Sequence, residues 1–214
     1  INKVLARAAE RAGVGMALGS QRAMLVAPSQ TDSFDAKKAA PQLPLLFGNV
    51  GAVQFNYGVG PEDVAHLGES VNADAINLHL NPLQEAIQPE GDTRFADLAP
   101  KIEAVCGHLS LPVLAKEVGS GMSVKTATKL ARLPLAGIET AGVGGTSWAK
   151  VESFRAPAES MQAEGGRRLA GFGMSTAESV INCREAFASR VVIASGGMRT
   201  GYDAAVAIAL GADA

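Results

Sequence analysis

Short runs of apolar residues alternate along the chain with stretches in which apolar residues recur at helical spacing. Six runs have the length and β-branched character of strands, at 14–18, 44–50, 73–80, 112–116, 135–140 and 191–195. The stretches of helical spacing lie at 2–12, 32–40, 61–72, 95–107, 122–132, 176–188 and 201–210. Because the two patterns alternate throughout, the sequence predicts an α/β fold with a parallel sheet.

The strand patterns favour a barrel over an open sheet. The run Val191 to Ala194 is apolar on both faces, as in a parallel strand covered by helices. At least five strand ends carry polar or glycine-rich residues, which suits a rim built from many loops, whereas an open doubly wound sheet concentrates them at one switch point. We predict a single (β/α)8 TIM barrel domain over residues 1–214 that lacks strands 1 and 8, since only six strand patterns are present.

The segment 148–175 shows no strong strand or helix pattern. A connection of this length is uncommon inside a compact domain unless it has a function. We expect a mobile active-site loop here, and a surface insertion is the alternative.

Composition narrows the class of protein. The chain has 214 residues, 47% of them hydrophobic and 19% charged, so it can bury a core. Its formal charge of -2 lacks the basic excess of nucleic-acid-binding proteins. No apolar run is long enough for a membrane helix and no secretory leader opens the chain, so we expect a cytoplasmic protein with no membrane partner. Two cysteines and three histidines without metal-site spacing predict neither disulfides nor structural zinc.

Two glycine-rich segments follow neighbouring strand patterns. They are AGVGGTS at 141–147 and SGGMRTG at 195–201, and a helix pattern begins after the second. Bare backbone N–H groups and a helix N-terminus can hold a phosphate, although paired glycines also form plain tight turns. Two such loops on adjacent strands favour one phosphorylated cofactor.

Lys116 ends the apolar run PVLAK at 112–116. A lysine at a strand end has a buried stem and an ammonium at the pocket, where it could form a Schiff base or stabilise an anionic ring or carbonyl. The alternative is an ion pair with Glu117 or another carboxylate, and the sequence leaves both open.

The densest polar cluster, HLNPLQE at 79–85, closes another strand. Alternation along that strand places Asn77, His79 and Asn81 on one face. Glu85, with its amide neighbours, forms the kind of oxygen-rich site that takes Mg²⁺ together with substrate phosphates.

An earlier strand ends in GSQR at 19–22. Arg22 could grip a phosphate and Ser20 could donate a hydroxyl hydrogen bond, while a solvent-exposed arginine is the alternative. Asn49 ends the next strand and fits the same rim.

Seven segments carry a resemblance that spans nearly the whole chain: GMALGSQR, LLFGNVGAVQ, NLHLNPLQE, LPVLAKEVG, AGVGGTSWAKVE, GMSTAES and ASGGMRTGYDAAVAIALGADA. They resemble the type 2 isopentenyl diphosphate isomerases. The resemblance implies an FMN-dependent barrel that interconverts isopentenyl diphosphate and dimethylallyl diphosphate in isoprenoid biosynthesis. It also implies a need for Mg²⁺, a reduced flavin as acid-base group with NADPH as reductant, and a homo-oligomer, a tetramer or larger.

The resemblance also assigns roles to residues at the strand ends. The FMN contacts that it implies are Ser20, Asn49, Lys116, Thr146, Gly196, Gly197, Met198 and Arg199. The substrate contacts that it implies are Ser20, Gln21, Arg22, His79, Asn81, Gln84 and Trp148. Gln84 and His79 are the catalytic side chains in this scheme, and Glu85 holds Mg²⁺.

Two other functions are alternatives. An FMN-dependent 2-hydroxy-acid oxidase or dehydrogenase shares the paired-glycine loop and the strand-end lysine. Such an enzyme needs a rim histidine as base, and the late strand ends here have none. A flavin-binding barrel without catalysis is the other alternative, but it would not require His79, Gln84 and Glu85 together.

Overall fold

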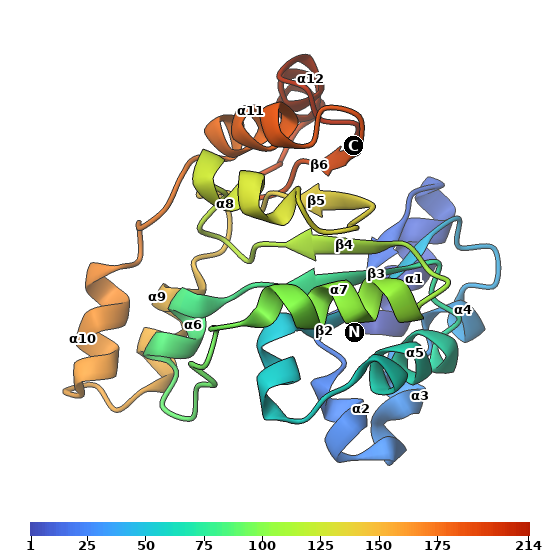
Figure 1. Cartoon of the computed structure of the whole chain (residues 1–214), viewed down its shortest axis with the longest axis horizontal. Coiled ribbons are helices and arrows are strands. Elements are labelled where there is room, and N and C mark those ends of the chain that lie inside the picture. Colours follow the sequence, from blue (N-terminus) through green and yellow to red (C-terminus); the bar gives the residue numbers. More distant parts are fainter. The chain divides into compact units, whose positions relative to one another are not determined.

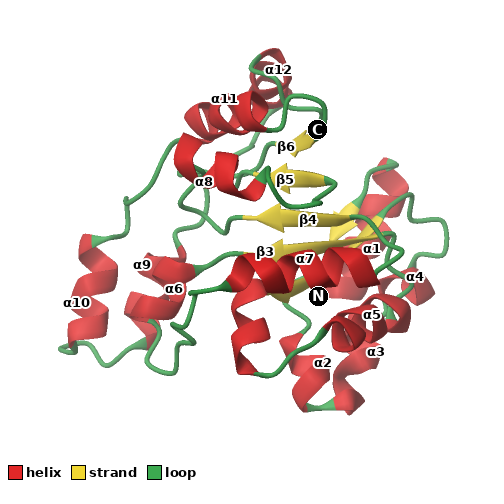
Figure 2. Ribbon diagram, in the orientation of Figure 1, coloured by secondary structure: helices red, strands yellow, loops and turns green.

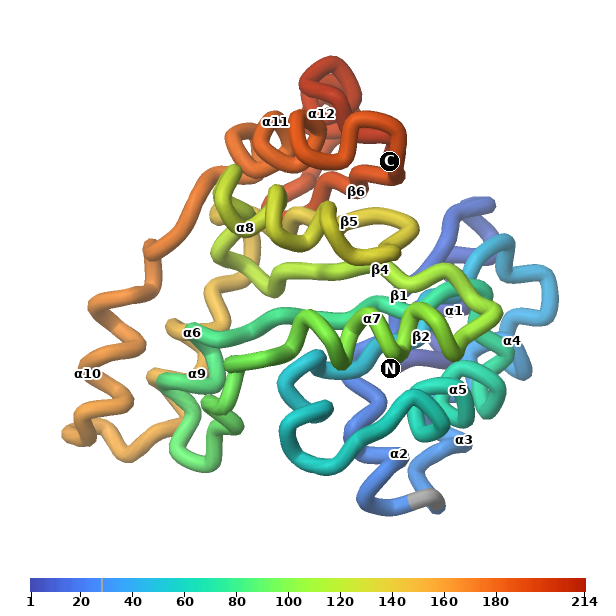
Figure 3. The backbone as a smooth tube through the Cα atoms, viewed as in Figure 1, coloured from blue at the N-terminus to red at the C-terminus, as the bar shows by residue number. Residues whose placement is uncertain are grey.

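The computed structural model describes residues 1–27 and 29–214, and Figure 3 traces the backbone through them. Six strands form, one at each predicted position (Figure 1). They are β1 (Met16–Ala17), β2 (Leu46–Gly51), β3 (Ala75–His79), β4 (Val113–Lys116), β5 (Gly137–Glu139) and β6 (Val191–Ile193). Their order in the sheet is β1-β2-β3-β4-β5-β6, and each pair with a defined register is parallel. The predicted parallel α/β fold is confirmed, and within the described residues the sheet ends at β1 and β6 without closing.

Most predicted helices form where helical spacing indicated them (Figure 2). They are α1 (Asn2–Ala12), α5 (Pro61–Ser70), α7 (Leu98–His108), α8 (Val124–Leu130), α11 (Thr176–Ala186) and α12 (Gly201–Ala209). The stretch 32–40 divides into α3 (Thr31–Phe34) and α4 (Ala36–Ala39), because Asp35 between them caps α4 by accepting a hydrogen bond from the Lys38 backbone N–H. Among the described residues, no helix has both the length and the apolar character that crossing a membrane requires.

Four short helices were not predicted. They are α2 (Arg22–Val26), η1 (Pro28–Gln30), η2 (Ala52–Tyr57) and α6 (Pro82–Ile87), where η denotes a 3-10 helix. Each is too short for helical spacing to stand out in the sequence.

The segment 148–175, predicted as a loop, contains two further helices. α9 (Trp148–Arg155) begins after Ser147 and α10 (Met161–Arg168) begins after Ser160. Each serine hydroxyl accepts a hydrogen bond from the backbone N–H three residues later, which stabilises a helix start by about 1 kcal/mol. The expectation of an irregular loop does not hold, because capping supports two helices of weak periodicity. The mobility of the segment stays a prediction.

The chain divides into two compact units. Unit 1 contains residues 1–79 and 98–114, and unit 2 contains residues 80–97 and 115–214, so β4 begins in unit 1 and ends in unit 2. Each unit has its own buried side chains and its own strand ends. That the two form a single domain stays a prediction.

In unit 1, β2 and β3 are buried along their length. Val50 and Leu78 are each 1% exposed, and Ile76 is equally buried. Gly48 in β2 allows this close packing, because a Cβ at that position would lie 2.7 Å from the Ile76 Cδ1. Helix α5 packs against α7 in the same unit. The apolar character of these two strands therefore follows from their burial.

In unit 2, β5 pairs with β6. Val191 in β6 is 43% exposed, so the predicted cover on both faces of the run 191–194 does not hold there. Ile138 and Val192 are fully buried and paired in register. A cluster of Val180, Ala207 and Ala212 packs α11 and α12 together.

Asp74 supports unit 1 through a charged hydrogen-bond pair, which makes the unit sensitive to pH. Its carboxylate accepts hydrogen bonds from the Leu46 backbone N–H at 2.7 Å and from the Lys37 ammonium at 2.8 Å. Burial raises the pKa of Asp74, but these donors outweigh it and hold the pKa below the ordinary value of 3.8. Because the pKa is lowered on folding, the stabilisation is present above about pH 4 and is lost as the pH falls through the folded-state pKa.

We expect Asp74→Asn to lower the free energy of unfolding by about 1 kcal/mol at pH 7 after allowance for solvent screening. The loss should be much smaller at pH 3, where the carboxylate of the parent is largely protonated in the unfolded chain. Urea denaturation at both pH values measures the difference. Glu90→Gln, at an exposed carboxylate, is the control, and an equal loss at both pH values would contradict this account.

Candidate cofactor and substrate site

The carboxyl ends of β2 and β3 carry the first group of predicted site residues, in unit 1. The register pairs Asn49 with Asn77 and Gly51 with His79. Asn49 donates from Nδ2 to the Leu18 carbonyl at 2.8 Å, so its Oδ1 faces His79 Nδ1, also at 2.8 Å. With this amide orientation, His79 Nδ1 is the hydrogen-bond donor and Asn49 Oδ1 the acceptor. Gly51 makes room for the ring, because a Cβ there would lie 2.9 Å from His79 Nε2.

Gln21 has a structural role that differs from the predicted substrate contact. The residue is 0% exposed. Its Oε1 accepts a hydrogen bond from the Asn49 backbone N–H at 2.8 Å, and its Nε2 donates to the Leu67 carbonyl at 3.1 Å. The Gln21 amide is therefore committed to the interior of unit 1, where it ties the segment after β1 to β2 and α5.

Ser20 and Arg22 flank Gln21 at the start of α2, and both are exposed. The Ser20 hydroxyl accepts a hydrogen bond from the Arg22 backbone N–H at 3.4 Å. The structure thus brings these two predicted diphosphate contacts together on the surface of unit 1.

The segment after β3 holds the second group, in unit 2. Asn81 is 3% exposed and donates from Nδ2 to Glu85 Oε1 at 2.8 Å and to Gln84 Oε1 at 3.2 Å. Glu85 Oε2 accepts a hydrogen bond from the Asp92 backbone N–H at 2.6 Å. Within the described residues, the buried Asn81 Oδ1 has no hydrogen-bond partner.

These oxygens fit a Mg²⁺ ion that also binds substrate. Mg²⁺ takes oxygen ligands and commonly uses only one or two carboxylates, with water and substrate phosphate completing the shell. Glu85 supplies the carboxylate, and Asn81, which donates to it from Nδ2, has an Oδ1 without a partner among the described residues. In residues 1–27 and 29–214, His, Cys, Asp and Glu side chains form no group of three that would bind a metal alone.

Glu152 on α9 is a site residue that the sequence analysis missed. It is 0% exposed and accepts a hydrogen bond from Gln84 Nε2 at 3.1 Å. Arg155, one turn later, donates to both of its oxygens at 3.0 and 2.8 Å. The signal was present, because Glu152 ends the string AGVGGTSWAKVE and lies four residues after Trp148. The assignment of this segment to a loop concealed that helical spacing.

Lys116 at the end of β4 pairs with a carboxylate, as the alternative interpretation proposed. Its ammonium lies 3.1 Å from Glu139 Oε1 and donates to the Glu117 carbonyl at 2.8 Å. The ion-pair partner is thus Glu139 at the end of β5, whereas Glu117 contributes its backbone. The ammonium keeps a third N–H, so pairing does not exclude a ligand contact.

The Glu117 carboxylate organises the loop after β4. Its Oε2 accepts hydrogen bonds from the backbone N–H groups of the next four residues, Val118, Gly119, Ser120 and Gly121. Burial raises the pKa of Glu117, and these four donors only partly offset the effect. The loop and the carboxylate therefore hold each other in place.

The two glycine-rich loops lie against each other in unit 2. Gly196 and Gly197 have φ values of 106° and 76°, in the left-handed region. A Cβ on Gly197 would lie 2.5 Å from the Gly144 carbonyl oxygen, and one on Gly196 would lie 2.2 Å from that of Gly142. Both positions therefore require glycine, and the two loops form one surface.

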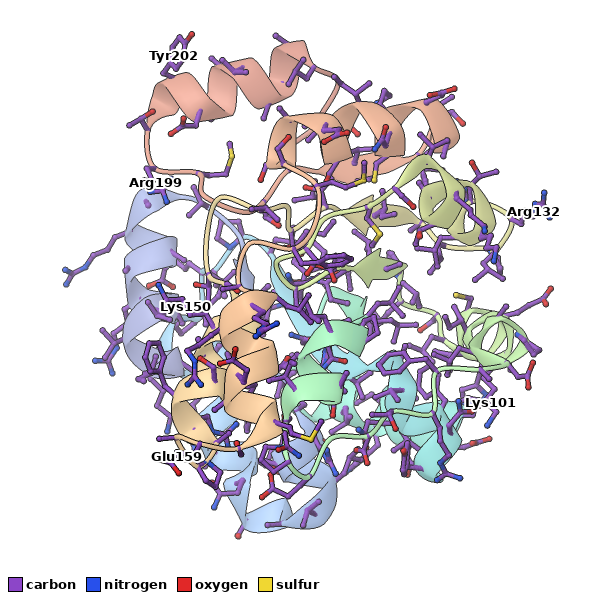
Figure 4. All side chains as sticks on the ribbon, turned by 90° about the vertical axis from the view of Figure 1, so that its left-hand side faces the viewer. Lys101, Arg132, Lys150, Glu159, Arg199 and Tyr202 are labelled. Carbon is purple, nitrogen blue, oxygen red and sulfur yellow. The ribbon has the colours of Figure 1, made fainter. Side chains whose placement is uncertain are left out.

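Arg199 joins these loops and leaves backbone donors for a ligand. Its guanidinium donates to the carbonyls of Gly144 at 2.6 Å and Gly197 at 3.0 Å, and Figure 4 shows it just before α12. In the described part of the chain, the N–H groups of Gly197 and Met198 donate no hydrogen bond. Such donors before a helix fit the phosphate of FMN.

Thr146 and Trp148 lie on the loop that follows β5. Thr146 is exposed, and its carbonyl is 2.5 Å from where a Cβ on Gly119 would stand. Trp148 is 40% exposed and lines a small pocket with Gln84 and Glu117. The predicted substrate contacts Trp148 and Gln84 are thus brought together.

A larger cavity of unit 2 lies beside this pocket and has different chemistry. It has a volume of about 640 Å³ and is lined by apolar side chains such as Leu83 and Phe95, with the Glu117 carboxylate and no lysine or arginine. A carboxylate without cations repels a diphosphate. We therefore expect the diphosphate to bind outside this cavity.

The contact between the glycine loops generates a stability prediction. Gly196→Ala adds a Cβ at a positive φ and against the Gly142 carbonyl, so we expect the free energy of unfolding to fall by about 1 to 3 kcal/mol. Gly201→Ala is the matched control, because no atom lies within 4 Å of its added Cβ. Chemical denaturation compares the two variants with the parent, and equal stabilities of all three would contradict the close approach of the loops.

The chain is similar along its length to curated proteins called isopentenyl-diphosphate delta-isomerase. It is 47% identical over 213 residues to the one from Rickettsia bellii (strain RML369-C) and 48% identical over 213 residues to the one from Synechococcus sp.. These matches cover 100% of this chain but 62% and 61% of the two relatives, so the chain spans less than two thirds of their length. No family model matches the chain.

Two solved structures have the same fold. A mandelate oxidase mutant with a monooxide FMN adduct is 20% identical in sequence and superposes with a TM-score of 0.60. The superposition covers 100% of this chain and 57% of that chain. Inosine 5' monophosphate dehydrogenase from Legionella pneumophila is 20% identical in sequence and superposes with a TM-score of 0.62. The superposition covers 99% of this chain and 52% of that chain. At this identity the likeness shows the fold alone, whereas the likeness to the isomerases also extends through every strand end described above.

Proposed function

We propose that the chain belongs to an FMN-dependent, type 2 isopentenyl-diphosphate delta-isomerase that interconverts isopentenyl diphosphate and dimethylallyl diphosphate in isoprenoid biosynthesis. The observation that carries the proposal is the 47% identity over the whole chain to proteins with that name. The flavin-dependent subtype is supported by the phosphate-fitting glycine loops and by the fold in common with an FMN-containing mandelate oxidase. We propose a (β/α)8 barrel on the same grounds.

FMN would be held by the residues that the family resemblance assigns to it. Gly196, Gly197, Met198 and Arg199 would surround its phosphate. The further contacts would be Thr146, Lys116, Ser20 and Asn49. When bound and reduced by NADPH, FMN supplies an acid-base group for proton addition and removal without net redox change.

The substrate diphosphate and Mg²⁺ would be bound by side chains that carry charge or exposed oxygens. Glu85 would hold Mg²⁺, with Asn81 beside it. Ser20 and Arg22 would bind the diphosphate, since both are exposed at the start of α2. A bidentate guanidinium suits phosphate oxygens.

The catalytic side chains that we propose, Gln84 and His79, are each oriented by a neighbour. Glu152 accepts the hydrogen bond of Gln84 Nε2, and Asn49 accepts that of His79 Nδ1. A side chain with a fixed orientation can hold a C5 diphosphate against a proton donor with less loss of entropy. Trp148 would supply apolar contact to the hydrocarbon part of the substrate.

A 2-hydroxy-acid oxidase is the second candidate, favoured by the fold in common with the mandelate oxidase. It would need a histidine base at the late strand ends. The three histidines of the chain are His66 on α5, His79 on β3 and His108 on α7. Of these only His79 lies at a strand end, so the isomerase fits the residues better.

The assembly and location of the protein are further parts of the proposal. We propose a homo-oligomer, a tetramer or larger, in the cytoplasm. Both rest on the family resemblance.

The isomerase proposal predicts a specific order of changes in the absorption spectrum. We expect the purified protein to show a flavin absorption band that dithionite bleaches, followed by isomerisation of isopentenyl diphosphate with Mg²⁺ while the band stays bleached. Product analysis and the spectrum are recorded on the same sample. Stoichiometric reoxidation of the band by a 2-hydroxy acid's keto product would favour the oxidoreductase, and a protein without flavin would contradict both.

Glu85→Gln tests the metal role. We expect loss of Mg²⁺-dependent turnover with unchanged FMN content, because the amide loses the charge that binds the cation while the glycine loops are untouched. Glu90→Gln, at an exposed carboxylate five residues away, is the matched control. Turnover measured against Mg²⁺ concentration distinguishes them, and parental turnover of Glu85→Gln would remove Glu85 from this role.

A further inference from the structure

Three neighbouring strand ends in unit 2 converge on one carboxylate. Lys116 ends β4, Glu139 ends β5, and Ser195 lies two residues after β6. The Lys116 ammonium is 3.1 Å from Glu139 Oε1, and the Ser195 hydroxyl donates to that same oxygen at 2.8 Å. Ser195 Oγ in turn accepts a hydrogen bond from the Ala141 backbone N–H at 3.1 Å. The Glu139 carboxylate therefore contacts the Lys116 ammonium and is also linked to the backbone through Ser195.

This cluster limits what Lys116 can offer to a ligand. An ammonium has three N–H donors. One is directed to Glu139 and one to the Glu117 carbonyl, which leaves a single donor. The Lys116 and Glu139 side chains are 19% and 12% exposed, so water screens their interaction only weakly.

We propose that Glu139 is a positioning residue that acts on the bound flavin through Lys116, by fixing the ammonium and offsetting its charge. The inference rests on the proposed function, which assigns Lys116 to FMN. Ser195 holds the carboxylate in place for this purpose. Because the pair is neutral as a whole, Glu139 moderates the stabilisation that Lys116 gives to an anionic reduced flavin.

The test is the midpoint potential of protein-bound FMN, measured by dithionite titration against a reference dye. Glu139→Gln keeps an oxygen acceptor but removes the negative charge. We expect the affinity for reduced FMN relative to oxidised FMN to rise about tenfold, which is about 30 mV for a two-electron couple. Glu139→Asp keeps the charge and should restore the parental potential. Glu185→Gln removes an exposed carboxylate of the same unit and is the matched control, with no shift expected.

A double-mutant cycle with Lys116→Met separates positioning from a direct charge effect. If Glu139 acts through Lys116, Glu139→Gln shifts the potential less in the Lys116→Met background than in the parent. An equal rise in both backgrounds, or no rise in the parent, would overturn this inference and leave the proposed function standing. A parent protein that binds no FMN would overturn both.

If Glu139→Gln does not fold, the affinity of two other variants for FMN tests the inference instead. Lys116→Met leaves the Glu139 carboxylate without the Lys116 ammonium, whereas Lys116→Met/Glu139→Gln removes both charges together. Because the effect of Glu139 on FMN passes through Lys116, we expect the double variant and Lys116→Met to bind FMN with equal affinity. Binding about tenfold tighter by the double variant would reveal a direct charge effect of Glu139 on FMN and would overturn the inference.

Discussion

Parallel pairing of neighbouring strands is the constraint on which both units depend. In a parallel ladder the carboxyl ends of adjacent strands lie at one edge, so residues far apart in sequence become neighbours. In unit 1 this pairs Gly51 with His79 and brings Asn49 within hydrogen-bond distance of the same imidazole. In unit 2 it places Glu139 and Ser195 beside each other. In β2 and β3 the strand interiors are largely buried, so polar side chains collect near the strand ends.

The second constraint is that each buried polar group needs a partner, and it separates structural from functional side chains. Gln21 and Glu152 are both 0% exposed. The side-chain amide of Gln21 forms hydrogen bonds with backbone groups of unit 1, so Gln21 supports the fold. Glu152 instead receives the side chains of Gln84 and Arg155, so its carboxylate orients a group that remains half-buried and near Trp148. Burial alone would not have distinguished the two roles.

The sequence predicted the strand positions well because β-branched apolar runs have few other interpretations. It also indicated polar side chains at or near strand ends: Lys116 ends β4, Asn49 lies near the end of β2, and Glu85 lies in α6, which follows β3. Their roles at the site stay predictions. It failed on helices shorter than about three turns, where periodicity is weak, and on α9 and α10 in particular.

The sequence also could not identify which carboxylate pairs with Lys116. Lys116 and Glu139 are distant in the chain, and only the register of adjacent strands reveals that the carboxylate next to Lys116 is Glu139 and not Glu117. Gln21 shows the same limit, because the motif GSQR gives no sign that the Gln21 side chain turns inward.

Among the residues that the structure describes, the candidate site also contains a buried polar atom without a hydrogen-bond partner and two glycines in left-handed conformations. Asn81 Oδ1 is buried without a partner in the described residues, which costs about 1 to 3 kcal/mol. Gly196 and Gly197 adopt left-handed conformations that restrict the chain at an entropic cost. A cation beside Asn81 and an anion at the glycine loops would offset both costs. Since ligands that bind only the folded chain raise its free energy of unfolding, the same atoms that weaken the free protein are those through which binding would stabilise it.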